Sequence, residues 1–526
     1  MTTRRVARAS TPAAAAALVA ALVCLTARAP EANAPATDDR TIAHLLDRVT
    51  FSARPGDIDR VRRMGIVAYV DEQLHPERID DGALQARLAG FETLNLSNRE
   101  IAERYGIPAQ QARQAARART NGDGTDPRRD QPPPEEMRQR RLVLAELTEQ
   151  KLLRAIYSER QLEEVLVDFW FNHFNVFAGK GADRLLLTSY ERDVIRPNVL
   201  GSFRDLLGAT AHSPAMLFYL DNWLSVDPDA AKGLMNRRRA PQGNARRTGL
   251  NENYARELME LHTLGVEGGY TQHDIVEVAR VFTGWSIEDP RRGARFRFTP
   301  RLHDSGTKVV LGRTIRGGGE GEGEAVLDLL AGHPSTARFI STKLARRFVS
   351  DDPPAALVDR VARRFQETGG DLREVVRAIL TSPEFLSADA YRAKVKTPLE
   401  FVASAARATG AEIVRAGVLA RSLQELGMPL YLCEPPTGYA DRADAWVNTG
   451  ALVNRMNIAL ALASRQLPGV RVDLGRGGDL DAARDRMTRD WLRGDASPAT
   501  LETMARATDL SQLAALALGS PEFQRR

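Results

Sequence analysis

The chain has 526 residues, of which 43% are hydrophobic and 27% charged, so it is long and apolar enough to bury a large core. Its formal net charge is +5, but residues 1–36 contain four Arg and one Glu, and the remaining chain carries only +2. This near-neutral charge excludes a general electrostatic attraction to nucleic acid, so we expect no nucleic-acid partner. Only Cys24 and Cys433 occur, and a chain that has lost Cys24 can form no internal disulfide.

The N-terminus has the pattern of an export signal. Three Arg among the first eight residues precede an apolar run at 13–25 that is too short for a permanent membrane span. Small residues at 34–36 then match an A-x-A cleavage site. We therefore predict a signal peptide at 1–36 and an exported protein, periplasmic or extracellular after cleavage, with no permanent membrane span.

Helical periodicity dominates the rest of the chain, because apolar residues recur at spacings of three and four. In chain order it predicts helices over residues 55–74, 141–157, 190–211, 252–264, 273–284, 324–332, 335–349, 355–366, 371–381, 398–408, 416–426, 448–465 and 499–518. Strand character is limited to 295–298, where Arg and Phe alternate, and to the β-prone segment 308–311. We therefore predict a mainly α fold, a packed multi-helical bundle or array, with one small β-hairpin inserted near 295–311.

Composition divides the chain after the signal into four segments. Residues 37–114 are predicted as an N-terminal helical segment. Residues 115–140 are so rich in charge, Pro and Gly that we expect a disordered loop. A central helical core with the hairpin is predicted at 141–350, and a C-terminal helical subdomain at 351–526.

The first candidate site lies in the segment VLVDFWFNHFNVF at 165–177. Apolar residues occupy nearly all sides of a helix here, which predicts a buried helix. Asp168 and Asn172 then require hydrogen-bonding partners, and His173 can serve as a metal ligand or a general base. The alternative is a core His173 bonded to a backbone carbonyl, which is the commoner situation for a buried polar group.

The second candidate is the segment GLNENYARELMELHTLGVEGGY. On an ideal α-helix, Asn253, Glu257 and Glu260 fall within one ~60° sector, whereas His262 falls at the far edge of the neighbouring apolar stripe. Two carboxylates on one face can bind a divalent cation or divide acid and base roles. We therefore predict Glu257 and His262 as catalytic residues. Glu257 and Glu260, with His173, are the predicted metal ligands, and the alternative is a solvated helix face.

The third candidate is His303-Asp304, in the turn between the two predicted strands. A His and an Asp on a loop held by a rigid hairpin suit catalysis, so we predict His303 and Asp304 as catalytic residues. The alternative is an ordinary turn, because Asp-Ser-Gly is a favourable turn sequence.

An Arg-rich loop at 236–247 is a candidate anion-binding segment. Arginine forks suit sulfate, phosphate or uronate groups, and a solvated loop is the alternative. The predicted anion contacts are Arg237, Arg238, Arg239, Arg246 and Arg247. The sequence contains no H-E-x-x-H and no G-x-S-x-G, so it lacks the signatures of common zinc proteases and α/β-hydrolases. The cofactor stays unknown, with a divalent metal possible.

Several segments together resemble one bacterial family, called domain of unknown function 1800. The segments are FWFNHFNVF, GLNENYARELMELHTLGVEGGYTQHD, VARVFTGWSI, HDSGTKVVLG, HPSTARFISTKLARRFVSDDPP, SPEF, KVKTPLEF and PPTGY, and they occur in the family's order. The resemblance extends from about residue 41 to 523 and implies an exported helical protein without an established activity. It also implies a possible partner, because members are often encoded beside a sulfatase-like family.

Two hypotheses of function follow from these residues. The first is an enzyme, possibly a hydrolase of an envelope or extracellular polymer. In this hypothesis His173, Glu257, His262 and His303 converge in a pocket, with or without a divalent metal. The second is a non-catalytic envelope scaffold or partner-binding protein that works with the sulfatase-like neighbour. There, the same polar groups only join helices to each other.

Overall fold

The structure is a computed structural model, and it describes residues 38–106, 134–237, 249–289, 293, 295–475 and 479–526. The predicted signal peptide at 1–36 and residues 115–133 of the predicted loop lie outside this part. The side chains of the predicted anion contacts, Arg237, Arg238, Arg239, Arg246 and Arg247, also lie outside it.

Helices make up most of the described chain. The α-helices are α1 (Asp39–Val49), α2 (Asp57–Met64), α3 (Ile66–Gln73), α4 (Gly82–Leu88), α5 (Asn98–Ile101), α7 (Pro134–Tyr157), α8 (Gln161–His173), α9 (Leu187–Ser189), α10 (Phe203–Ala211), α11 (Pro214–Tyr219), α12 (Pro228–Arg237), α13 (Asn253–Glu257), α14 (Gln272–Val281), α15 (Glu320–Ala331), α16 (Pro334–Phe348), α17 (Ala355–Glu367), α18 (Leu372–Leu380), α19 (Pro398–Ala408), α20 (Gly417–Glu425), α21 (Thr449–Ala463), α22 (Leu480–Asp490), α23 (Pro498–Ala505), α24 (Leu510–Gly519) and α25 (Pro521–Gln524). Segments η2 (Ala102–Gly106), η4 (Tyr190–Ile195) and η7 (Leu258–Thr263) are π-helical. The predicted mainly α fold is confirmed.

Three two-stranded antiparallel sheets occur in the described part of the chain. The strands are β1 (Trp285–Ile287) with β2 (Phe296–Phe298), β3 (Lys308–Val310) with β4 (Arg313–Ile315), and β5 (Glu412–Ile413) with β6 (Val470–Arg471). Both predicted strand segments are therefore strands, but they do not pair with each other as expected.

The turn chemistry explains the different pairing. Leu311 and Gly312 join β3 to β4 with φ of 49° and 73°, and positive φ at both central positions defines the tight turn that suits a two-residue hairpin. The segment between β2 and β3 instead contains a 3-10 turn, η9 (Pro300–Leu302). A Leu-Gly turn lacks the Asn-Gly or Asp-Gly sequence that usually predicts such a hairpin.

Two of the predicted helices are interrupted. The helix predicted over 55–74 is α2 followed by α3, because Gly65 between them has φ of 89°, which a helix cannot contain. The helix predicted over 190–211 divides into η4, the 3-10 turn η5 (Arg196–Asn198) and α10. Pro197 lies in η5 and has no N–H to continue the helical hydrogen bonds. Conversely, α7 begins at Pro134, so the last part of the predicted loop at 115–140 is helical.

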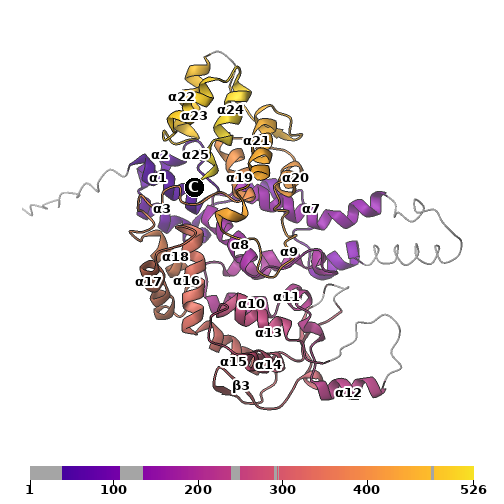
Figure 1. The fold of residues 1–526 in the computed structure, drawn as a ribbon. Coiled ribbons are helices and arrows are strands. Elements are labelled where there is room, and N and C mark those ends of the chain that lie inside the picture. Colours follow the sequence, from indigo (N-terminus) through magenta and orange to yellow (C-terminus); the bar gives the residue numbers. More distant parts are fainter. Residues whose placement is uncertain (1–37, 107–133, 238–248, 290–292, 294, 476–478) are drawn as a thin grey trace, which may run out of the picture. The chain divides into compact units, whose positions relative to one another are not determined.

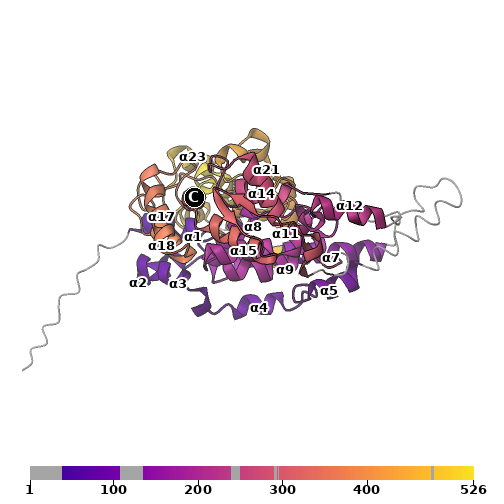
Figure 2. The same cartoon turned by 90° about the horizontal axis from the view of Figure 1, so that it is seen from below.

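Residues 38–526 form one compact unit with one main apolar core. Helix α8 is buried within that core and packs on α1, α3, α7 and η4. Helices α16, α17 and α18 lie side by side (Figure 1), and α16 also contacts η7. Helix α4 contacts α7, and both are labelled in the view from below (Figure 2). The predicted segment boundaries inside this unit stay predictions.

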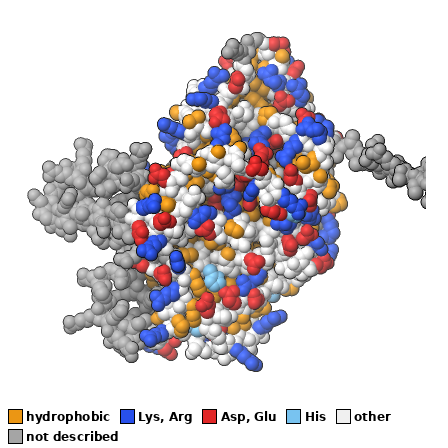
Figure 3. Space-filling model, turned by 180° about the vertical axis from the view of Figure 1, so that it is seen from behind, with side chains coloured by type: hydrophobic (Ala, Val, Ile, Leu, Met, Phe, Trp, Pro, Cys, Tyr) orange, Lys and Arg blue, Asp and Glu red, His pale blue; other side chains and the backbone are white. Residues whose placement is uncertain are grey.

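The surface that Figure 3 shows carries Lys and Arg side chains interspersed with Asp and Glu. Many are paired, as Arg360 is with Glu384 at 2.6 Å. Among the described residues, no helix combines the length and hydropathy needed to cross a membrane.

Candidate functional site

Helix α8 carries the polar residues of the first candidate site, Asp168, Asn172 and His173. Asp168 forms an ion pair with Lys151, with Oδ1 and Nζ 3.0 Å apart. Asn172 donates to the carbonyl oxygen of Tyr439 at 2.8 Å and accepts from its backbone N–H at 2.7 Å. Both residues thus have the partners that burial requires.

His173, the last residue of α8, lies beside His262. Its Nε2 is 3.1 Å from the carbonyl oxygen of His262, and the ring centroids are 6.2 Å apart. Burial, the charge of Lys343 and the neighbouring His262 ring lower the pKa of His173 well below its ordinary value, so the ring is neutral. A neutral imidazole has one N–H, and only an N–H can bond to a carbonyl. The proton is therefore assigned to Nε2, and Nδ1 carries a lone pair with no partner among the described residues.

His262 lies in the π-helical segment η7. The i→i+5 bonding of this segment is visible where the backbone N–H of Leu264 donates to the carbonyl oxygen of Met259 at 2.8 Å. Angles drawn on an ideal α-helix therefore do not hold for His262, and its ring enters the core beside Phe174, at 5.1 Å between centroids. Burial and the charge of Lys343 lower the pKa of His262 to about 3. Its Nε2 has no hydrogen-bond partner within the described chain.

Lys343 of α16 completes what we call the imidazole–lysine cluster, defined as His173, His262 and Lys343. Its ammonium lies 5.5 Å from the centre of the Phe339 ring, and the residue as a whole is half-buried. Phe339 in turn lies near His173, with the two rings tilted to each other at 6.3 Å between centroids. Burial and the charge of Arg346 lower the pKa of Lys343 to about 8.

The two predicted carboxylates occupy neighbouring turns, Glu257 at the end of α13 and Glu260 in η7. Burial and the nearby Glu260 raise the pKa of Glu257. Glu260 accepts a hydrogen bond from the Tyr270 hydroxyl at 3.3 Å. Arg256 turns instead to Glu252, at 3.3 Å, so in the described structure no cation pairs with Glu257.

No metal site is formed by side chains in the described residues. Nowhere in that part of the chain do three His, Cys, Asp or Glu side chains group closely enough to hold an ion. The roles of His173, Glu257 and Glu260 as metal ligands therefore stay predictions.

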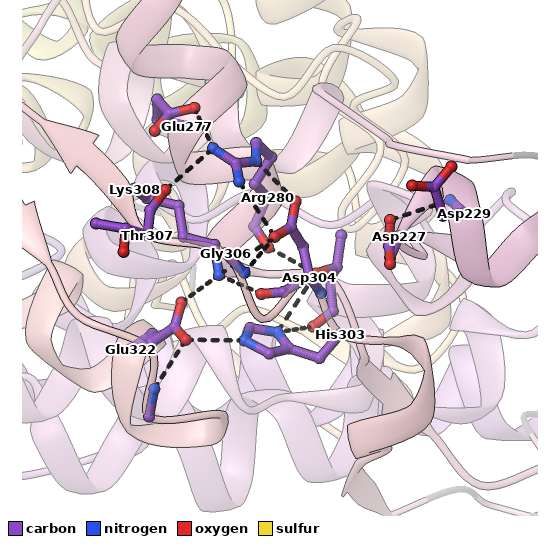
Figure 4. Close-up of polar contacts among 12 residues, drawn as sticks. Asp227, Asp229, Glu277, Arg280, His303, Asp304, Gly306, Thr307, Lys308 and Glu322 are labelled. Atoms are coloured by element: carbon purple, nitrogen blue, oxygen red, sulfur yellow. Dashed lines mark hydrogen bonds and ion pairs between the residues drawn. The ribbon is translucent and has the colours of Figure 1, made fainter.

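His303 and Asp304 belong to a separate polar network, drawn in Figure 4. His303 Nδ1 lies 2.8 Å from the carbonyl oxygen of Thr283, and its Nε2 lies 3.1 Å from Glu322 Oε1. Both ring nitrogens thus face oxygen acceptors. Arg280 donates hydrogen bonds to both carboxylate oxygens of Asp304, at 2.7 and 3.1 Å.

Lys308 connects Asp304 to Glu322 in this network. It bonds to the Asp304 carbonyl oxygen and lies 2.6 Å from Glu322 Oε2, and the side chains of Lys308 and Glu322 are 0% and 1% exposed. Although burial opposes ionisation, hydrogen bonds from Lys308 and from the Gly318 N–H hold the pKa of Glu322 below its ordinary value. We call these residues, with Arg280, His303 and Asp304, the hairpin network. No hydrogen bond, ion pair or ring contact in the described chain joins it to the imidazole–lysine cluster.

Comparison with family models identifies the chain. Residues 44–525 match the model of the family described as "Protein of unknown function (DUF1800)", which is nearly the whole chain. The chain belongs to this family. The matched residues of this DUF1800 protein include both the imidazole–lysine cluster and the hairpin network. No curated protein and no solved structure matches the chain.

The structure of this DUF1800 protein adds a residue that the sequence did not reveal. Lys343 lies in the segment STKLARR, where a Lys beside two Arg reads as part of a solvated face. The one local hint is Phe339, four residues earlier on the same helix face. The proximity of Lys343 to two histidines depends on how α16 packs, which periodicity does not contain.

Proposed function

We propose that this chain is an exported enzyme, a hydrolase of an envelope or extracellular polymer, whose reacting groups lie in the imidazole–lysine cluster. The observation that carries the proposal is the pair of neutral imidazoles whose ring nitrogens, His173 Nδ1 and His262 Nε2, lack partners in the described chain. A buried nitrogen lone pair without a donor costs free energy, and such a cost is typical of functional sites. In this site His173 Nδ1 accepts a proton, and Glu257, with its raised pKa, serves as a second acid or base.

The test is hydrolysis of isolated envelope polymers by the mature protein. We expect release of new chain ends, and at least a 100-fold loss in His173→Phe and His262→Phe, as for removal of a general acid or base. Asn253→Ala is the matched control, because Asn253 is exposed near the start of the neighbouring helix. Folded His variants with wild-type rates would overturn the proposal.

A divalent metal is a variant of this proposal, with His173, Glu257 and Glu260 as its ligands. Elemental analysis of the purified native protein is the direct measurement. Bound metal that is lost in both Glu257→Ala and His173→Ala supports this variant, and metal content unchanged in both variants contradicts it.

Export is supported by the basic, apolar and small-residue order of residues 1–36. The mass and N-terminal sequence of protein from the periplasm and the medium provide the test. An N-terminus near residue 37 is expected. A full-length protein retained in the cytoplasm would contradict export.

The second candidate is an envelope scaffold that works with a sulfatase-like protein. The hairpin network favours it, because His303 and Asp304, two of the residues predicted to be catalytic, are held by ion pairs and hydrogen bonds within the fold. Co-purification with that neighbour, together with folded His173 and Glu257 variants that match the wild type in metal content and ligand binding, would favour the scaffold over the enzyme.

A further inference from the structure

The seven lysines of the chain all lie in the described part, and five of them are ion-paired. The pairs are Lys151 with Asp168, Lys180 with Asp221, Lys232 with Asp229, Lys308 with Glu322, and Lys394 with Asp351, at N···O distances of 3.0, 2.7, 2.9, 2.6 and 2.6 Å. Lys343 and Lys396 make no ion pair with any described residue. A lysine withdrawn from water without a carboxylate readily loses its proton.

Access distinguishes these two lysines. Lys396 is 3% exposed and lies 3.9 Å from the centre of the Phe523 ring, so its amine is enclosed. Lys343 is half-buried, so part of its side chain is exposed to solvent. The pKa of Lys396 is lowered by burial to about 7 and that of Lys343 to about 8, so the two lysines can be compared as an enclosed and a partly exposed side chain.

The groups around Lys343 favour the neutral amine. On its own helix, the charge of Arg346 opposes protonation. Across from it, His173 and His262 are uncharged. Asp441 is the one acid that acts on it, and Lys394 already occupies that carboxylate at 2.8 Å.

We propose that Lys343, partly exposed and without an ion-pair partner among the described residues, is a further general base of the imidazole–lysine cluster. This inference rests on the proposed hydrolytic function. The Lys343 amine removes a proton from water, and the oxygen forms a bond to the electrophilic carbon of the polymer linkage. As the bond from that carbon to its leaving atom breaks, the Lys343 ammonium returns the proton to the leaving atom. The two chain fragments together carry one added water.

Trace acetylation of the full mature protein by acetic anhydride, followed peptide by peptide across pH, tests the state of the amine without a substrate. Lys343 is expected to titrate near pH 8, and Lys232, exposed and ion-paired, above pH 10. At pH 7 a lysine with pKa of about 8 has a neutral fraction roughly 200-fold larger than an ordinary lysine. Lys396 is the matched control, with a low pKa but little labelling because it is enclosed. Titration of Lys343 above pH 10 would overturn the proposal.

Charge variants sharpen this measurement. Arg346→Met removes the cation that opposes protonation and should move the Lys343 midpoint upward. Asp441→Asn removes the acid that favours protonation and should move it downward. A midpoint that responds to neither variant contradicts the proposed surroundings.

Lys343→Arg, which keeps the charge but cannot act as a base at neutral pH, connects the amine to the reaction. Loss of hydrolysis in Lys343→Arg with the fold intact supports the proposal, and Lys343→Arg with wild-type rate overturns it. A low midpoint for Lys343 in a protein that hydrolyses no polymer overturns the hydrolytic function and the catalytic role together. If hydrolysis is lost in His173→Phe but not in Lys343→Arg, the proposed function stands and only this inference is overturned.

Discussion

The hairpin network and the imidazole–lysine cluster each place a histidine and a lysine in or beside the core, yet they differ in how the polar atoms are satisfied. In the hairpin network both nitrogens of His303 face oxygen acceptors, and Lys308 has Glu322 at 2.6 Å. In the cluster, one nitrogen of each histidine lacks a partner in the described chain. Burial of polar residues therefore does not by itself identify a site. The partners of each atom separate a structural group from a chemically available one.

The largest loss of stability is expected when the hairpin network is broken. Glu322→Ala removes the carboxylate nearest the Lys308 ammonium, which is 0% exposed and then keeps only Asp304 Oδ1, 3.8 Å away. Loss of one partner of a buried pair costs about 3–5 kcal/mol of unfolding free energy. Urea unfolding measures this. Glu320→Ala, at an exposed position in the first turn of the same helix, should change the stability by less than ~0.5 kcal/mol. A loss below ~1 kcal/mol in Glu322→Ala would show that the network does not support the fold.

The next effect tests whether Lys308 and Glu322 act as a pair. Lys308→Met combined with Glu322→Ala removes both charges, so the double variant should be more stable than the sum of the single effects by ~1–3 kcal/mol. The double-mutant cycle is measured by the same urea unfolding. Strict additivity would mean that the two side chains do not interact.

The turn of the β3–β4 hairpin sharpens the comparison, because this hairpin carries Lys308. Gly312 has φ of 73°, so Gly312→Ala should cost about 1 kcal/mol. No atom lies near the position of the added Cβ, so strain in the backbone alone accounts for the loss. Hydrogen exchange should increase at β3 and remain unchanged at α8. Equal changes at both elements would indicate that the two regions are coupled.

A smaller change in stability is expected in the cluster. His262→Phe removes a buried nitrogen that has no partner in the described chain, so the unfolding free energy should change by less than ~1 kcal/mol in either direction. Thermal unfolding measures it. A loss of several kcal/mol would mean that the imidazole makes hydrogen bonds that support the fold.

The last expected effect is a pH dependence of stability that comes from Lys343. Its pKa is about 8 in the folded protein, below that of an unfolded lysine near 10.4, so the unfolded state binds more protons between these values. Stability from this group therefore rises as pH increases from about 8 to 10. The difference between wild type and Lys343→Met, measured by urea unfolding across this range, should show that rise. Parallel profiles would place the lysine in an ordinary solvated environment.

Local patterns predicted much of the fold but not its interruptions. The near-continuous apolar surface of 165–173 correctly indicated a buried α8. The strand segments at 295–298 and 308–311 were found, yet each pairs with a neighbour that the sequence did not mark as a strand. The position of His262 was predicted from the angles of an ideal α-helix, and these do not apply because η7 is π-helical.

The sequence by itself determined the helical class, the family, and the burial of His173, because these depend on composition and on spacing within one helix. Only the tertiary structure decided that His173 meets His262, 89 residues away, that His303 instead joins Glu322, and that Lys343 makes no ion pair with a described residue. The physical reason is that periodicity indicates only which side of one helix is apolar. The pairing of polar atoms from different helices depends on how several helices pack together.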